Sequence, residues 1–232
     1  MKIKRTCFGQ LIFETASNEF TKVELLTRLE DATMPLEKYF QTLSNRETLD
    51  LIAEQLEIAR TIHQNTGLVS TINVPASLID APEDVNLLKR VLRGFARPLV
   101  LEFTETLPMP DSRACNRLFC ELRDMGYQVA LDDFGTGFNG MSIFADYDFD
   151  IVKIDRSLIM RINERPNKIS LMKMVIEMVH SFGKTTVVEG VEDPDQIELV
   201  RNLRPNFVQG FFYHKPQRWQ DLLVLHSQLE LA

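Results

Sequence analysis

The sequence has few of the residues from which disulfide frameworks and zinc sites are built. Among 232 residues there are three cysteines, no Cys-x-x-Cys pair, four histidines and one tryptophan. An odd number of scattered thiols is typical of a reducing compartment and argues against both kinds of site. We therefore expect a cytoplasmic protein whose fold depends on its own apolar core.

Long apolar runs and a basic excess are also absent. No stretch approaches the roughly 20 apolar residues of a membrane span, and the start, MKIKRTCFGQ, lacks the apolar run of a signal peptide. The formal net charge of −7 opposes broad nucleic-acid binding. We expect neither a membrane nor DNA as a partner. A small phosphate ligand stays compatible with this charge, because bound cations bring anions into acidic clefts.

Short apolar segments alternate with longer helical patterns along the chain. The predicted strands are Leu11–Glu14, Val23–Leu26, Leu68–Asn73, Leu99–Phe103, Gln128–Asp132, Ile151–Ile154, Thr185–Val188 and Asn206–Val208. The predicted helices are Leu36–Gln64 (one helix or two), Glu83–Phe95, Asp111–Met125, Lys168–Phe182, Asp193–Asn202 and Arg218–Leu229. The pattern Ser44-Asn45-Arg46-Glu47 predicts a capping box inside the first of these helical stretches.

About eight strand–helix units in 232 residues predict an α/β fold with a mainly parallel sheet. Units of this size favour a (β/α)8 barrel, and we expect residues 1–232 to form one domain. A doubly wound open sheet is the second interpretation. No Gly-x-Gly-x-x-Gly follows a predicted strand to support it.

Polar side chains stand at the carboxyl ends of seven consecutive predicted strands. These residues are Glu24, Asn73, Glu102, Asp132 with Asp133, Lys153, Glu189 and Gln209. In a barrel, the carboxyl ends of the parallel strands surround one mouth, where barrel enzymes carry their chemistry. We call the five acids among these residues (Glu24, Glu102, Asp132, Asp133 and Glu189) the acid ring.

The acid ring predicts a metal centre. Five carboxylates this close raise one another's pKa unless cations are bound, and all-oxygen ligation suits Mg²⁺ or Mn²⁺. Two adjacent aspartates let one carboxylate bridge two ions, the arrangement that cleaves phosphodiesters. Lys153 would then neutralise a phosphoryl oxygen or hold the attacking water. Taken one at a time, acids after strands are more often helix caps or loop residues, and Lys153 and Asp155 together are compatible with an exposed ion pair.

Longer motifs carry a resemblance to a known family. They are Glu24-Leu25-Leu26 with Arg28, Asn73, Glu102-Phe103-Thr104-Glu105, Asp132-Asp133-Phe134-Gly135-Thr136-Gly137, Lys153-Ile154-Asp155, Glu189-Gly190-Val191-Glu192, and Gln209-Gly210-Phe211 with Lys215-Pro216. In this order, over nearly the whole chain, they resemble the motifs of the EAL domain, a family of cyclic di-GMP phosphodiesterases.

The resemblance implies a modified TIM (β/α)8 barrel whose first strand is antiparallel to the others. It implies metal-dependent hydrolysis of cyclic di-GMP to linear pGpG with two Mg²⁺ or Mn²⁺ ions, in bacterial signalling that controls biofilm formation. A homodimer and a regulatory protein partner are further expectations. The alternative is a catalytically weak EAL protein that acts as a cyclic di-GMP sensor or a protein-binding regulator.

The resemblance also assigns roles by position. The metal ligands it implies are Glu24, Asn73, Glu102, Asp132, Asp133 and Glu189. In a second interpretation of the family mechanism, the resemblance makes Glu189 the general base. It implies that Lys153 contacts the attacking water and the scissile phosphate, and that Glu105 and Glu192 support catalysis. Arg28, Gln209 and Asp155 are expected on the substrate side.

The sequence departs from the family pattern in several places, among them shortened segments on both sides of Glu24. Leu25 stands where the family's signature has alanine, and Asn139-Gly140 stand where a serine pair is usual. All the acids of the implied metal site are present, which favours catalysis over the regulator alternative. His214, between Gln209 and Lys215, is more typical of a structural loop histidine than of a ligand contact.

Overall fold

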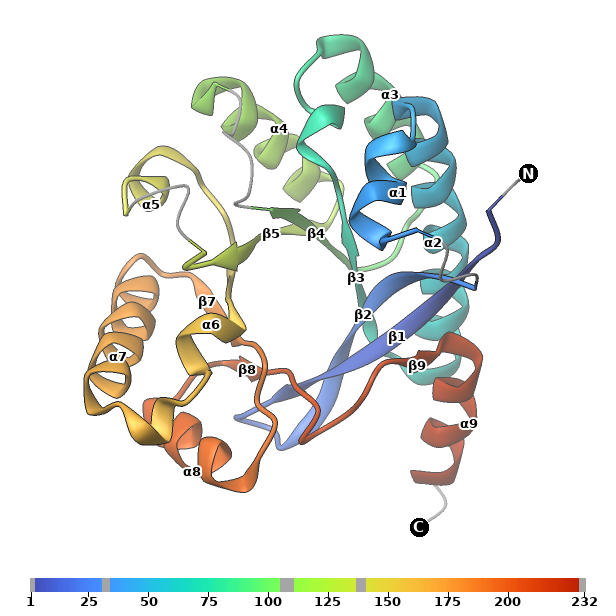
Figure 1. The fold of residues 1–232 in the computed structure, drawn as a ribbon. Coiled ribbons are helices and arrows are strands. Elements are labelled where there is room, and N and C mark those ends of the chain that lie inside the picture. Colours follow the sequence, from blue (N-terminus) through green and yellow to red (C-terminus); the bar gives the residue numbers. More distant parts are fainter. Residues whose placement is uncertain (1–2, 31–33, 105–110, 137–140, 230–232) are drawn as a thin grey trace.

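The computed structural model describes residues 3–30, 34–104, 111–136 and 141–229. Eight of its strands close into a barrel, and helices surround it (Figure 1). The barrel strands are β1 (Arg5–Glu14), β2 (Glu19–Leu29), β3 (Val69–Asn73), β4 (Leu99–Thr104), β5 (Tyr127–Phe134), β6 (Ile151–Ile154), β7 (Thr185–Val188) and β8 (Phe207–Val208). The predicted modified TIM barrel is confirmed.

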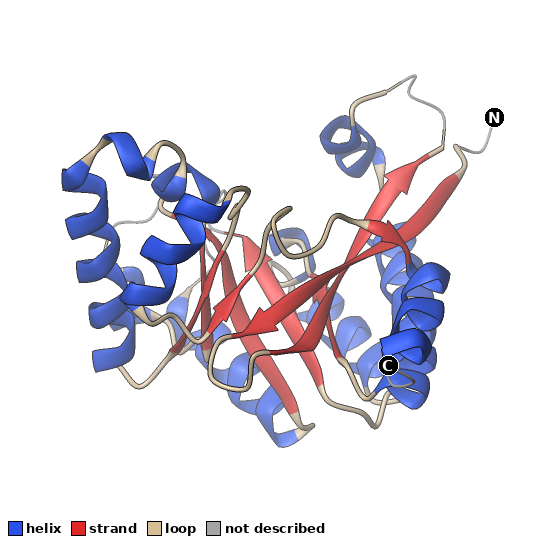
Figure 2. Ribbon diagram, turned by 90° about the horizontal axis from the view of Figure 1, so that it is seen from below, coloured by secondary structure: helices blue, strands red, loops and turns tan. Residues whose placement is uncertain are grey.

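The first strand is the antiparallel one, as expected. Strands β2 to β8 pair in parallel in chain order, whereas β1 pairs antiparallel with both β2 and β8 and so closes the barrel. In this register Gln10 lies opposite Glu24. The amino-terminal half of β1 therefore reaches the mouth, at the carboxyl ends of the other strands. Figure 2 shows β1 and β2 continuing beyond the barrel as a two-stranded ribbon.

Local sequence signals set the limits of the helices. These are α1 (Leu36–Thr42), α2 (Asn45–Thr66), α3 (Pro82–Leu92), α4 (Ser112–Asp124), α5 (Ile143–Asp146), α6 (Arg156–Ile159), α7 (Pro166–Ser181), α8 (Pro194–Leu203) and α9 (Trp219–Leu229). Ser44 and Glu47 form the predicted capping box, and Leu43 has extended backbone. The stretch from Leu36 to Gln64 is therefore two helices. None of the described helices has the length and apolar character to cross a bilayer.

The sequence pattern did not predict the shortest elements. Helices α5 and α6 have four residues each, the 3-10 turns η1 (Ala76–Leu78) and η2 (Ile162–Glu164) have three, and β9 (Gln217–Arg218) has two. Such elements are too short to show a period. The two-residue β9 pairs with β1 at Phe8 and Gly9. It leads into α9, whose Leu222 packs so closely on Gly9 that a Cβ there would lie 2.4 Å from Leu222 Cδ1.

The apolar core has two parts. A large cluster fills the space between the strands and the surrounding helices. A smaller cluster lines the barrel interior, with Ile12, Val100, Ala130, Ile151, Val187 and Phe207 buried and Val69 packed against them. Because alternate residues of a strand face the same side, the residue two positions on from an interior residue faces the interior again. From Val100, Ala130, Ile151, Val187 and Phe207, this step leads to Glu102, Asp132, Lys153, Glu189 and Gln209. The polar mouth is thus the next layer above an apolar barrel floor.

Candidate active site

Lys153 occupies the centre of the barrel mouth. Its side chain is 2% exposed, and its Nζ atom lies 2.9 Å from Asp132 Oδ1, 2.9 Å from Glu189 Oε1, 3.1 Å from Glu102 Oε2 and 3.6 Å from Glu24 Oε1. Four strands from different parts of the chain thus direct a carboxylate at one ammonium. The interpretation of Lys153 and Asp155 as an exposed ion pair is wrong, because Lys153 is buried and pairs with other acids.

The amide of Gln209, just after β8, supports the acid ring at Glu24. Nε2 of Gln209 donates to Glu24 Oε2 at 2.6 Å and to Gln10 Oε1 at 3.2 Å. The loop that carries Gln209 is packed tightly, since a Cβ on Gly210 would lie 2.1 Å from the carbonyl oxygen of Val191. Only glycine fits there. The Gln-Gly sequence therefore sets how closely the loop after β8 approaches the loop after β7.

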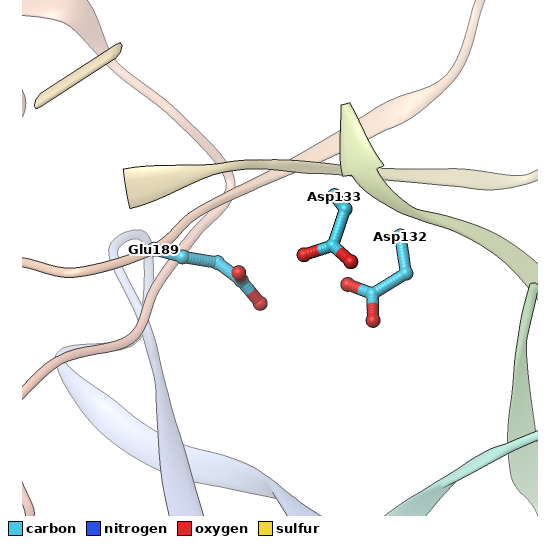
Figure 3. Close-up of side chains that lie close together, drawn as sticks. All are labelled: Asp132, Asp133 and Glu189. Atoms are coloured by element: carbon cyan, nitrogen blue, oxygen red, sulfur yellow. The ribbon is translucent and has the colours of Figure 1, made fainter. Parts of the chain in front are cut away.

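A break in strand regularity brings the two adjacent aspartates together. In a regular strand Asp132 and Asp133 would face opposite sides of the sheet. Here the pairing of β5 with β6 shifts register between Leu131 and Phe134, and Asp133 has a φ of +57°, in the left-handed region. Such irregularities redirect side chains, often beside active sites. Carboxylate oxygens of Asp132, Asp133 and Glu189 lie within 4.8 Å of one another (Figure 3).

Burial and mutual repulsion disfavour the ionised forms of the acid ring. Burial raises the pKa of Glu102 well above its usual value and that of Glu189 to about 8, in spite of the adjacent Lys153. Burial and the neighbouring Asp132 raise the pKa of Asp133 to about 6. Burial alone would lower the pKa of Lys153, but the surrounding carboxylates raise it well above its usual value. Lys153 therefore stays protonated among acids whose ionised forms it stabilises only in part.

The donor set fits hard divalent cations. The three grouped side chains offer only carboxylate oxygens, the ligands that Mg²⁺ and Mn²⁺ take. Asn73, at the end of β3, is the Cα partner of Glu102 on β4, so its position adds an amide beside the same site. Glu24 and Glu102 face the ammonium of Lys153, as Asp132 and Glu189 do. The expected ligands thus lie around one mouth, with Lys153 among them.

The other predicted residues lie farther from the centre. Arg28 is on β2 four residues beyond Glu24, opposite Thr6, and its guanidinium donates to the Thr27 carbonyl at 2.9 Å. Asp155 accepts from the backbone N–H of Ser157 and caps α6. Glu192 is exposed just before α8. Glu105, Asn139 and Gly140 lie outside the described residues. Sequence reasoning missed Gln10, whose signal was a polar side chain inside the apolar run from Phe8 to Phe13.

Comparison with known proteins decides the family. The profile of the EAL domain matches residues 6–216, which is nearly the whole chain. The chain belongs to the EAL domain family. The EAL match includes every polar residue that we placed at the barrel mouth, from Gln10 on β1 to His214 after β8.

Two bacterial relatives have names that refer to cyclic di-GMP. The chain is 33% identical over 157 residues to the probable cyclic di-GMP phosphodiesterase PdeG of Escherichia coli, an alignment that covers 66% of this chain and 31% of that protein. It is 27% identical over 205 residues to the cyclic di-GMP phosphodiesterase TpdA of Vibrio parahaemolyticus, covering 87% of this chain and 35% of that protein. The chain thus spans about a third of the length of these relatives.

Solved EAL structures share the fold. The EAL domain protein of Listeria monocytogenes superposes with a TM-score of 0.84 at 24% identity, covering 96% of this chain and 92% of that one. The EAL enzyme Bd1971, in a form with cAMP and cyclic di-GMP bound, has a TM-score of 0.86 at 23% identity, covering 96% of this chain and 64% of that one. BlrP1 of Klebsiella pneumoniae, solved with manganese and cyclic di-GMP, has a TM-score of 0.76 at 25% identity, covering 91% and 56%.

Proposed function

We propose that this EAL domain hydrolyses one phosphodiester bond of cyclic di-GMP to give linear pGpG, with two Mg²⁺ or Mn²⁺ ions at the acid ring. One observation carries the proposal: Glu24, Glu102, Asp132 and Glu189 converge on the buried Lys153, with Asp133 turned toward the same point. The names of PdeG and TpdA and the manganese complex of BlrP1 support the substrate and the metal.

The residues divide the work by position. Asp132, Asp133 and Glu189 would hold one ion together, and Glu24, Asn73 and Glu102 would complete the other with Asp132. When bound, the ions supply Lewis-acid stabilisation of the attacking and leaving oxygens. Lys153 stays protonated and offers its ammonium to the phosphate oxygens and the attacking water. Arg28, four residues beyond Glu24 on β2, would bind a substrate phosphate, and Glu189 is the candidate general base.

The first experiment is a product assay. The protein is incubated with cyclic di-GMP and Mg²⁺ or Mn²⁺, and pGpG is followed by chromatography. We expect metal-dependent product that disappears with EDTA and in Glu24→Ala. The matched control is Glu121→Gln, which removes a carboxylate paired with Lys89 on the outer helices and leaves the mouth intact.

Two other outcomes would replace the proposal. Tight binding of cyclic di-GMP with no product at high protein concentration would make the domain a sensor. Neither product nor binding, with a cellular effect that survives Glu24→Ala, would make it a protein-binding regulator. The homodimer, the regulatory partner and the extent of the domain over residues 1–232 stay predictions.

A further inference from the structure

His214 links the loop after β8 to β1 by hydrogen bonds. Nδ1 of His214 accepts from the backbone N–H of Leu11 at 3.2 Å, and its carbonyl oxygen accepts from Gln10 Nε2 at 3.0 Å. Its own backbone N–H donates to the Gly210 carbonyl at 3.0 Å. One residue therefore joins the start of the loop and two consecutive residues of β1. The Leu11 contact requires an unprotonated Nδ1, and burial lowers the pKa of His214, which favours this neutral form.

The same glutamine that binds His214 also binds Gln209. Gln10 uses both ends of its amide: Nε2 donates to His214, and Oε1 accepts from Gln209 Nε2 at 3.2 Å. The Gln10 amide cannot flip without setting its NH2 group against that of Gln209 and its oxygen against the His214 carbonyl. Its orientation is thus fixed by contacts 204 and 199 residues away along the chain.

The orientation of Gln10 determines that of Gln209. The two hydrogens of Gln209 Nε2 point to Gln10 Oε1 and to Glu24 Oε2. A flipped Gln209 would place its oxygen against the Glu24 carboxylate. In the observed orientation Gln209 Oε1 is buried and, among the described residues, has no hydrogen-bond partner. It is an acceptor left for a donor at the mouth, such as a hydroxyl or an N–H group of a ligand.

We propose that Gln10 and His214 form a clamp that positions Gln209 and, through it, the Glu24 carboxylate. Both are positioning residues: they hold the amide that holds the proposed metal ligand Glu24. Neither side chain has a hydrogen bond to the acid ring among the described residues, although Gln10 lies opposite Glu24 in the pairing of β1 with β2. The expected effect of the clamp on catalysis rests on the proposed function. Its expected effect on the orientation of Gln209 does not, because that effect depends only on contacts within the chain.

A buried glutamine elsewhere in the fold shows what a merely structural role looks like. Gln55 of α2 is as buried as Gln10, and the hydrogen bond recorded for its side chain is a long one, 3.4 Å, to the Leu25 carbonyl on the outer side of the barrel. Among the described residues, its side chain has no hydrogen bond to Gln209 or Glu24. Gln55→Met is therefore the matched control for Gln10→Met, since both replace a buried amide by an apolar chain of similar length.

The direct test is the side-chain amide signal of Gln209 in the nuclear magnetic resonance spectrum of the metal-free protein, assigned by its loss in Gln209→Met. We expect the chemical shift of this signal to change in Gln10→Met and His214→Leu and to keep its wild-type value in Gln55→Met. His214→Asn places an oxygen acceptor near the position of Nδ1. The Gln209 signal of His214→Asn should therefore lie closer to that of the wild type than the signal of His214→Leu. Circular dichroism identifies variants that are folded. An unchanged Gln209 signal in folded Gln10→Met and His214→Leu would overturn the clamp.

A double-mutant cycle tests the link to the site. Changing the outer partners of a metal site typically costs 10–100-fold in affinity or activity, so we expect about a tenfold loss of Mn²⁺ affinity and of kcat/KM in Gln10→Met. In Gln209→Met the added Gln10→Met change should cost nothing more, because the clamp acts through Gln209. Losses that multiply in the double variant would show that Gln10 acts independently of Gln209.

The two proposals fail separately. If the wild type makes no pGpG, the proposed function is wrong, while the Gln209 signal and the Mn²⁺ titration still decide whether the clamp exists. If the wild type is active and Gln10→Met matches Gln55→Met in every measurement, the clamp is wrong and the proposed function stands.

Discussion

The ammonium of Lys153 lies 3.1 Å from the carboxylate of Glu102, and neither side chain is more than 2% exposed. Burial of such a pair is costly unless each charge stays compensated. The four acidic side chains around Lys153 provide this compensation for its ammonium, so the mouth has an internal cation of its own.

Replacing this cation should destabilise the metal-free protein. Removing one partner of a buried ion pair costs about 3–5 kcal/mol, so Lys153→Met should lower the thermal unfolding temperature in EDTA. Mn²⁺ should raise that temperature more in Lys153→Met than in the wild type, because the ions then supply the missing positive charge. The control is Lys184→Met, which removes a cation that binds Asp148 outside the mouth. Equal Mn²⁺ effects in the wild type and Lys153→Met would contradict this account.

The stability of the metal-free protein should fall as pH rises from about 4 to about 8. Folding raises the pKa of Asp133 from 3.8 to about 6 and that of Glu189 from 4.5 to about 8. Over this range the folded protein binds more protons than the unfolded chain, so the free energy of unfolding decreases with pH. Metal ligation requires the deprotonated acids, so Mn²⁺ affinity should increase over the same range. Thermal unfolding in EDTA and calorimetric Mn²⁺ titration at pH 5, 6.5 and 8 measure both trends. A pH-independent Mn²⁺ affinity would contradict the second.

Asp133 should contribute to Mn²⁺ binding while its backbone conformation lowers the stability of the fold. Its φ of +57° is in the left-handed region, which costs a non-glycine residue about 1–2 kcal/mol. Asp133→Gly should therefore be at least as stable as the wild type in EDTA, while it loses Mn²⁺ affinity and pGpG formation. Asp133→Ala loses the same carboxylate and keeps the strain, so it should be less stable than Asp133→Gly. Denaturant unfolding of both variants checks this order.

Gly210→Ala should disturb the mouth without removing any polar group. The new Cβ would lie 2.1 Å from the carbonyl oxygen of Val191 and 2.4 Å from its nitrogen, so the backbone must move. We expect lower stability and at least tenfold lower kcat/KM, because the loop carries Gln209. Gly94→Ala is the control, since its Cβ would meet Val91 at an ordinary 3.7 Å. Wild-type activity in Gly210→Ala would show that the position of the loop does not matter.

Much of the barrel could be predicted from the alternation of short apolar strands with helical patterns, and much of the mouth from the polar residues at the carboxyl ends of those strands. Ile151–Ile154 and Thr185–Val188 have the predicted bounds. The polar residues predicted at the strand ends share one mouth, although β2 continues to Leu29, beyond Glu24. The convergence of Lys153 on four acids could not be predicted. Its contacts join strands up to 129 residues apart, and sequence spacing does not determine which side chains meet across a barrel.

Side-chain networks were the least predictable part. Gln10 belongs to the mouth because β1 is antiparallel, and the family resemblance implied that direction without naming Gln10. The left-handed conformation of Asp133 could not be predicted either. Aspartate is common in turns of several kinds, and a regular strand would direct two adjacent acids to opposite faces. His214 has the structural role that its loop position favours, but its partners on β1 lie more than 200 residues away.

The reversed direction of β1 also determines where the chain enters the barrel. Because Arg5 pairs with Leu29, beyond Arg28, the described chain begins at the rim of the mouth and not at the barrel floor. Any domain joined ahead of β1 would be attached within reach of the substrate. Force or movement transmitted through that joint would reach Gln10 within five residues, and Glu24 through Gln209. The strand that closes the barrel would thus connect an upstream partner to the acid ring through Gln10, which lies opposite Glu24.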